Sequence, residues 1–271
     1  MDSNTEWQVS GNAAQRYEEH LVPVIFVPWA EHLIGRAGLR DGQAVLDIAC
    51  GTGIVARMAA DKVGSGGRVA GVDLNAGMLA VARDSAAAEG RKIDWQEGNA
   101  QDLPFDDGTF DAVFCQQGLQ FFPDKVTALS EMRRVLKPGG RALVCVAAAL
   151  AENPLMQTQV AAFDRHLDSA SGDAIRAVCG LHDAATIRGL TADAGFADAE
   201  VEKITLTLRH PDARAFVAGL MKATPNAGRI ADMPEDKRAQ ILQDLLDGFG
   251  ACVQGDALEF PHVSHVIDAR A

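Results

Sequence analysis

Short apolar runs alternate with amphipathic stretches along the first half of the chain. The runs predict strands at residues 43–49, 68–74, 93–98, 110–116 and 141–148. In the stretches between them, apolar residues recur every three or four positions, the period of a helix with one buried face. Strands that alternate with helices form right-handed crossovers, and hence a parallel sheet covered on both faces. The pattern therefore predicts an α/β fold.

The rest of the chain has a different pattern. Residues 149–182 lack a clear period and are interpreted as an insertion. Beyond them the sequence predicts a helix at 183–195, a strand at 198–210, helices at 211–222 and 234–249, and a terminal strand at 257–271. The first 35 residues also predict helix. We interpret the chain as one domain in three parts: a helical cap over 1–40, a ligand-binding core over 41–148, and a lid insertion with C-terminal strands over 149–271.

Composition narrows the class of protein. The chain has 37 acidic and 25 basic residues, a formal net charge of −12, which disfavours a nucleic-acid partner because a phosphate backbone attracts basic surfaces. No apolar run is long enough to predict a membrane span, and the N-terminus lacks the pattern of a secretory signal. The five cysteines are dispersed without a CxxC pair, so neither a disulfide framework nor a metal site is predicted. We expect a cytoplasmic protein.

A glycine turn follows the first predicted strand. In "VLDIACGTG", Gly51 and Gly53 lead directly into a helix, at the edge where parallel sheets bind ligands. Asp73 ends the next strand 22 positions after Gly51, where its carboxylate can accept hydrogen bonds from both hydroxyls of a ribose. The spacing Gly51, Gly53, Ala56 also fits a dinucleotide fingerprint. On these residues alone, both a dinucleotide and S-adenosylmethionine remain open as the ligand.

Four ordered motifs resemble the class I S-adenosylmethionine-dependent methyltransferases, most closely the quinone- and natural-product-type enzymes that act on small molecules. The motifs are "VLDIACGTG", "GVDLNAGMLAVAR", "GNAQDLPFDDGTFDAVFCQQGLQFFPD" and "EMRRVLKPGGRALV". The resemblance covers residues 10–148 closely and continues more loosely over 190–208. It implies a Rossmann-like seven-stranded sheet of order 3-2-1-4-5-7-6, with the last strand antiparallel, helices on both faces and a helical lid. Residues 41–148 would then bind S-adenosylmethionine.

The resemblance also implies roles for particular residues in cofactor binding. Asp73 would bind the ribose, and Leu74 and Met78 would pack on the adenine. Asn99 stands where the family usually has aspartate; its side chain and the backbone of Ala100 would meet the adenine edge. The implied cofactor-binding set is Tyr17, Asp47, Ala49, Gly51, Gly53, Asp73, Leu74, Met78, Asn99, Ala100 and Gln116.

Candidates for catalysis follow the fourth strand and lie in the N-terminal helix. In the resembled fold, Gln116, Gln117 and Gln120 face the transferred methyl group, and their amides could orient a hydroxyl or carbonyl of the acceptor. Tyr17, the single tyrosine, would close over the cofactor. We take Gln116, Gln120 and Tyr17 as the catalytic candidates. Four histidines are further candidate bases: His182, His210, His262 and His265.

The sequence predicts methyl transfer from S-adenosylmethionine to an oxygen or activated carbon of a lipophilic small molecule. Apolar stripes in the predicted lid favour such an acceptor. No Asn-Pro-Pro-Tyr-like segment follows the fourth strand, which argues against amine acceptors in nucleic acid or glutamine. Two alternatives remain: a protein that binds S-adenosylmethionine without methylating, and a nicotinamide-dependent oxidoreductase. The sequence leaves a homodimer open.

Overall fold

The computed structural model describes residues 13–196 and 198–271. Its central sheet has the order β3-β2-β1-β4-β5-β8-β6, and a short strand, β7, pairs with β8. The strands are β1 (Ala44–Ile48), β2 (Arg68–Asp73), β3 (Asp94–Glu97), β4 (Phe110–Gln116), β5 (Leu136–Ala147), β6 (Glu200–His210), β7 (Val253–Gln254) and β8 (Ala257–Arg270). Strands β1 to β5 pair in parallel, whereas β8 is antiparallel to β5 and β6. The predicted order and the antiparallel last strand are confirmed.

The strand order helps to distinguish a dinucleotide from S-adenosylmethionine, the two ligands that the glycine turn left open. The common dinucleotide-binding order is 3-2-1-4-5-6. Here the last strand of the chain, β8, inserts antiparallel between β5 and β6, as in the sheet expected from the resemblance.

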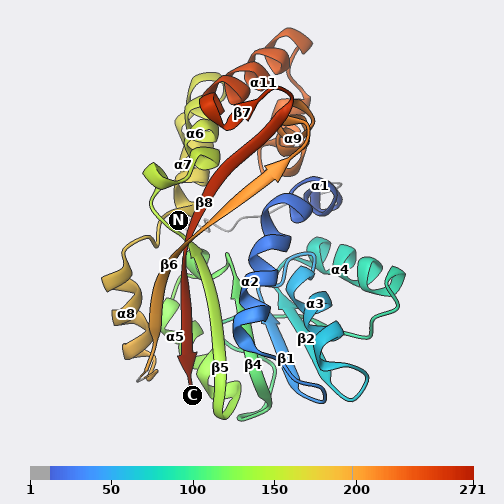
Figure 1. Ribbon diagram of the computed structural model, residues 1–271, viewed down its shortest axis with the longest axis vertical. Helices are drawn as coiled ribbons and strands as arrows, with labels where there is room; N and C mark the ends of the chain where they lie inside the picture. The colour runs from blue at the N-terminus through green and yellow to red at the C-terminus, as the bar shows by residue number, and fades with distance from the viewer. Residues whose placement is uncertain (1–12, 197) are drawn as a thin grey trace.

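Helices cover both faces of the sheet (Figure 1). They are α1 (Ala13–His20), α2 (Val27–Ala37), α3 (Ile54–Val63), α4 (Ala76–Ala88), α5 (Lys125–Val135), α6 (Pro154–His166), α7 (Ser169–Val178), α8 (Ala184–Asp193), α9 (Ala213–Ala223), α10 (Ala227–Ala231) and α11 (Glu235–Phe249). Successive strand residues point to opposite faces, so Val45 of β1 belongs to the core cluster that includes α2 and α3, and Leu46 to the cluster that includes α5 and α8. Among the described residues, no helix is both long enough and apolar enough to cross a membrane.

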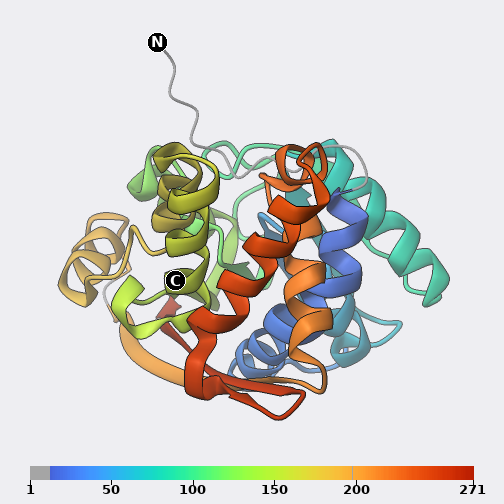
Figure 2. The same ribbon diagram turned by 90° about the horizontal axis from the view of Figure 1, so that it is seen from above.

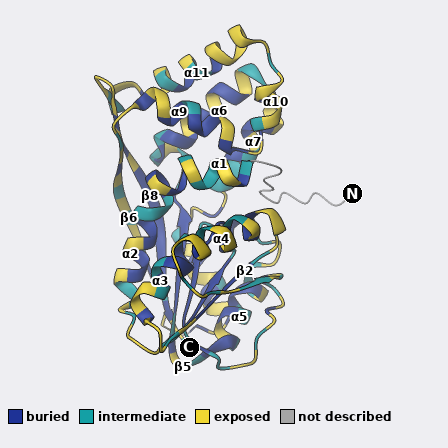
Figure 3. Cartoon of the chain, turned by 90° about the vertical axis from the view of Figure 1, so that its right-hand side faces the viewer, coloured by how far each residue is buried: buried dark blue, intermediate teal, exposed yellow. Residues whose placement is uncertain are grey.

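A second helical layer lies above the carboxyl ends of the parallel strands. Helices α6, α7, α9 and α11 pack their apolar faces around Leu208 of β6 and Phe260 of β8. Strands β6 and β8 are long enough to run from the sheet into this layer (Figure 1). Seen from above, α6 and α7 lie on one side, α1 and α9 on the other, and α11 crosses between them (Figure 2). The outward faces of these helices are exposed and the inward faces are buried (Figure 3).

Several predicted elements differ in extent from the observed ones. The segment 149–182, read as an insertion without a period, contains α6 and α7, and neither α10 nor β7 was predicted. Strand β5 begins at Leu136, five residues before the predicted start at residue 141. The reason is that Leu136 pairs with Phe110 ahead of a shift in register between the two strands. The N-terminal helix is divided by a π-helical segment, Val22–Phe26, which contains Pro23. Residues 1–12 of the predicted cap lie outside the described residues.

Candidate active site

A cavity of about 230 Å³ lies between the carboxyl ends of the parallel strands and the upper helical layer. Most of the predicted site residues line it: Tyr17, Ala49, Gly51, Asp73, Leu74, Met78, Asn99, Ala100, Gln116 and Gln120. The remaining two predicted residues, Asp47 and Gly53, are not part of the lining. The cavity therefore gathers the predicted cofactor and catalytic residues at one place.

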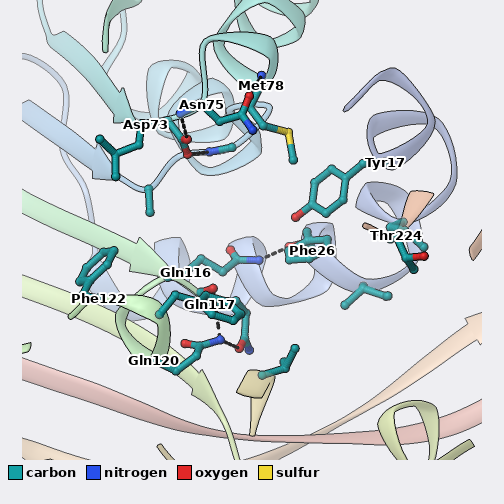
Figure 4. Close-up of a pocket in the computed structure, with 18 of the residues that line it drawn as sticks. Tyr17, Phe26, Asp73, Asn75, Met78, Gln116, Gln117, Gln120, Phe122 and Thr224 are labelled. Atoms are coloured by element: carbon teal, nitrogen blue, oxygen red, sulfur yellow. Dashed lines mark hydrogen bonds between the residues drawn. The ribbon is translucent and has the colours of Figure 1, made fainter. Parts of the chain in front are cut away.

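Asp73 holds the glycine turn against the end of β2. Its Oδ2 accepts a hydrogen bond from the Gly51 backbone amide at 2.7 Å, and its Oδ1 accepts one from the Asn75 amide at 2.8 Å (Figure 4). A carboxylate has about four lone-pair sites, so each oxygen can accept one further bond from a ligand. Burial raises the pKa of Asp73, and the two amides oppose that rise. Gly51 has φ of 54°, and a Cβ built there would meet no atom within 4 Å, so open space lies over the turn.

The next residues form an apolar ledge beside this turn. Leu74 is 48% exposed, the one exposed large hydrophobic side chain in residues 13–196 and 198–271. Met78 is buried in the first turn of α4, which the Asn75 side chain caps by accepting from the Met78 amide at 3.1 Å. Ala100 is buried opposite, and Asn99 accepts from the Gln101 amide through Oδ1. Leu74, Met78, Asn99 and Ala100 all line the cavity, so this apolar surface faces its space.

Tyr17 reaches the cavity from α1. Its ring packs on Phe26 with centroids 4.9 Å apart, and its hydroxyl points toward the space between Asp73 and Gln116 (Figure 4). Burial, and then the nearby charge of Asp73, raise the pKa of this phenol well above its usual value. The hydroxyl therefore stays protonated at neutral pH and acts as a hydrogen-bond donor and acceptor, not as a base.

Gln116 and Gln120 each have one buried side-chain oxygen without a protein partner. The Gln116 amide nitrogen donates to the Phe26 carbonyl at 2.9 Å, and the Gln120 amide nitrogen donates to the Gln117 carbonyl at 3.2 Å. These bonds fix both amides so that Oε1 is the free acceptor. Since buried polar atoms are nearly always paired in native proteins, the two oxygens indicate a ligand that donates hydrogen bonds.

Asp47 and Gly53 lie behind the turn. Asp47 accepts from the Ala56 amide at 3.1 Å in the first turn of α3, and burial raises its pKa to about 8. Gly53 has φ of 84°, and a Cβ there would come within 2.3 Å of the Trp95 ring. Close packing on Trp95 accounts for this glycine, and the Asp47 carboxyl supports the turn from the protein side. Neither residue has a contact with the cavity.

Sequence reasoning singled out only part of the cavity's upper wall. That wall consists of Leu155, Met156, Gln159, Ile175, Val178, Leu220 and Thr224, with His262 from β8. The apolar stripes of the predicted lid include Leu220 in the helix predicted at 211–222, and the lid segment 152–157 contains Leu155 and Met156. His262 is one of the four candidate bases. These residues are far apart in sequence and lie on separate helices, so no local pattern brings them together. His182, His210 and His265 do not line the cavity.

The residues present fit S-adenosylmethionine. Free lone pairs on Asp73 suit ribose hydroxyls, the ledge of Leu74 and Met78 suits an adenine ring, and the space over Gly51 admits the chain of the cofactor close to the backbone. In the described part of the chain, no cluster of three or more histidine, cysteine or acidic residues could hold a metal ion.

Fold and site together define a class I S-adenosylmethionine-dependent methyltransferase fold. The chain belongs to the ubiE/COQ5 methyltransferase family, whose sequence model matches residues 22–209.

Individual relatives agree with this family. The chain is 44% identical over 117 residues to 2-phytyl-1,4-beta-naphthoquinone methyltransferase of Arabidopsis thaliana, covering 42% of this chain and 45% of that protein. It is 32% identical over 200 residues to demethylmenaquinone methyltransferase of Staphylococcus epidermidis, covering 70% and 80%. The chain spans about half the length of several curated relatives that it matches.

A solved structure shares the fold. It is phosphoethanolamine N-methyltransferase 2 of Haemonchus contortus with S-adenosylhomocysteine bound, with a TM-score of 0.59 at 21% identity. The match covers 95% of this chain and 56% of that one.

Proposed function

We propose that this protein transfers the methyl group of S-adenosylmethionine to an activated carbon or an oxygen of a lipophilic acceptor of the quinone class. One observation carries the proposal: a single cavity extends from the Asp73–Gly51 turn to an apolar wall of the upper helices. The names of the relatives, which act on naphthoquinone and demethylmenaquinone, support the acceptor class.

The chain's own residues supply binding and orientation. When bound, S-adenosylmethionine supplies an electrophilic methyl group. Asp73 and the backbone at Gly51 would hold the nucleoside end, and Tyr17 would cover the cavity from α1. The apolar upper wall excludes water and places an acceptor ring over the remaining space. Positioning of this kind can supply about 7–11 kcal/mol of the barrier.

Gln116 and Gln120 would bind the acceptor's oxygen-bearing edge. A hydroxyl on the acceptor can donate to either free Oε1, which increases electron density on that hydroxyl and on the ring attached to it. A more electron-rich ring or oxygen attacks the methyl group more readily. This role needs no formal charge on the protein and agrees with a cavity lined mostly by apolar side chains.

The same proposal includes a small-molecule acceptor in the cytoplasm. The chain's net charge of −12 disfavours a nucleic-acid acceptor.

The test is methyl transfer to a defined acceptor. Purified protein is incubated with methyl-labelled S-adenosylmethionine and a 2-alkyl-1,4-naphthoquinone, kept either oxidised or chemically reduced. We expect label in the organic fraction with the reduced form, because the quinol ring is the better nucleophile. A double variant, Gln116→Leu with Gln120→Leu, should lose most of the rate yet keep binding S-adenosylhomocysteine.

Two outcomes would contradict the proposal. Tight binding of S-adenosylhomocysteine without label in any small-molecule fraction would favour a binding protein that does not methylate. Tight binding of NAD in its place would favour an oxidoreductase, against the observed sheet order.

A further inference from the structure

His262, in the upper wall of the cavity, forms a buried pair with Trp29, which does not itself line the cavity. The indole Nε1–H of Trp29, on α2, donates to Nδ1 of His262, on β8, at 3.0 Å. Trp29 is 0% exposed and His262 is 1% exposed, and the two rings meet edge to face with centroids 5.7 Å apart. Residue 262 lies beyond the segment 22–209 that the family model matches, whereas Trp29 lies within it.

This hydrogen bond determines which imidazole nitrogen carries the proton. An indole N–H can only donate, so Nδ1 of His262 must accept and cannot hold a hydrogen. In a neutral imidazole the proton is then on Nε2. Burial lowers the pKa of His262 to about 4, so the ring is neutral near pH 7. His262 therefore cannot serve as the general base that its sequence position left open, because its free nitrogen is already protonated.

The Nε2–H has no hydrogen-bond partner within the described residues, and His262 lines the cavity. Its neighbour on the same face of β8, Ser264, accepts from the Gln117 side chain at 3.0 Å, and Gln120 donates to the Gln117 carbonyl. The wall that carries His262 is thus continuous with the glutamines. The cavity lining thus includes one fixed donor, His262, and two unpartnered acceptors, the Oε1 atoms of Gln116 and Gln120. An oxygen that can both accept and donate is complementary to such a set.

We propose that His262 is a binding residue for the acceptor: its Nε2–H donates to an oxygen on the acceptor's ring, and Trp29 holds it in that tautomer. The identity of the acceptor rests on the proposed function. The identity of the donor rests on the geometry of the Trp29–His262 pair. An acceptor without that oxygen would leave the donor unpaired in an apolar wall, so the pair selects for oxygenated rings.

The experiment measures binding in the presence of S-adenosylhomocysteine, independently of turnover. Two probes are compared by calorimetry without oxygen: a 2-alkyl-1,4-naphthoquinol and the matching 2-alkyl-1-naphthol, which lacks one ring oxygen. The wild type should prefer the quinol by about 10- to 100-fold, the effect of one buried hydrogen bond with its desolvation cost. His262→Asn, whose Oδ1 can still accept from Trp29, should bind both probes nearly equally. His262→Gln, which can place an N–H near the original Nε2, should recover part of the preference.

A second readout tests the tautomer directly. Two-bond ¹⁵N–¹H correlation spectra of protein labelled at histidine should show the proton of His262 on Nε2, and Trp29→Phe should release that preference. A proton on Nδ1 in the wild type overturns the proposal, as does a wild type that binds the two probes equally or binds neither. A quinol preference that His262→Asn retains also overturns it. Selective binding without methyl transfer would instead contradict the proposed reaction and leave the donor assignment supported.

Discussion

The two sides of the cavity are built in different ways. On the sheet side, the turn residues are close in sequence and satisfy one another, as Asp73 does with the amides of Gly51 and Asn75. On the helical side, residues such as Met156, Leu220 and His262 come from three elements that are distant along the chain. The comparison shows that the residues on the sheet side are brought together by nearby sequence, whereas those on the helical side meet only through the packing of the upper helices.

The largest expected effect is on the sheet side. Asp73→Ala removes the acceptor of two backbone amides and of the expected ribose bonds. We expect the Kd for S-adenosylhomocysteine to rise about 10²- to 10⁴-fold, or about 3–6 kcal/mol, measured by calorimetry. Asp212→Ala is the control, because Asp212 is a carboxylate that caps α9 at its amino end, away from the cavity. Equal affinities in the two variants would remove Asp73 from the cofactor site.

On the helical side, alanine variants of two core residues distinguish a loss of stability from a loss of acceptor binding. Leu220 and Ile241 are both buried in the upper core, but only Leu220 lines the cavity. Alanine at either position should cost about 2–5 kcal/mol in the free energy of unfolding, measured with urea. Only Leu220→Ala should also raise the KM for the acceptor, with the affinity for S-adenosylhomocysteine unchanged. The same KM in both variants would show that this wall does not touch the acceptor.

The two glycines of the turn should respond differently. Both have positive φ, so alanine costs about 1–2 kcal/mol at each position. At Gly53 the new methyl also meets the Trp95 ring, so Gly53→Ala should lose more stability and Gly51→Ala more cofactor affinity. Urea unfolding and calorimetry on both proteins test the difference. If Gly53→Ala is as stable as Gly51→Ala, the contact with Trp95 does not constrain the turn.

The last prediction concerns the pH dependence of stability. The carboxyl of Asp47 titrates near 3.9 in the unfolded chain, but its pKa is about 8 when folded. Between these values the folded protein holds a proton that the unfolded chain has lost, so the free energy of unfolding falls as pH rises from 4 to 8. Asp47→Asn, which can still accept from Ala56, should reduce that slope by up to about 1.4 kcal/mol per pH unit. An unchanged slope would mean that Asp47 is ionised in the folded protein.

Periodicity in the sequence predicted the parallel sheet, and the resemblance to known motifs predicted its order. Together they identified most of the residues on the sheet side of the cavity. Apolar periodicity located the strands, and the spacing from Gly51 to Asp73 located the turn, because contacts between successive strand ends repeat in a regular α/β fold. Resemblance to known motifs added Leu74, Met78 and Asn99, and the structure places all three in the cavity lining.

Only the tertiary structure decided the helical wall and the state of its polar groups. No spacing along the chain predicts that Trp29 Nε1 lies 3.0 Å from His262 Nδ1. The sequence pattern in 149–182 likewise did not predict α6 and α7. Such contacts arise from packing between elements that are remote in sequence, where side-chain volume and burial decide which groups meet. The same packing determines protonation: removal from water keeps His262 neutral and Asp47 protonated, and burial of that kind exists only after the chain has folded.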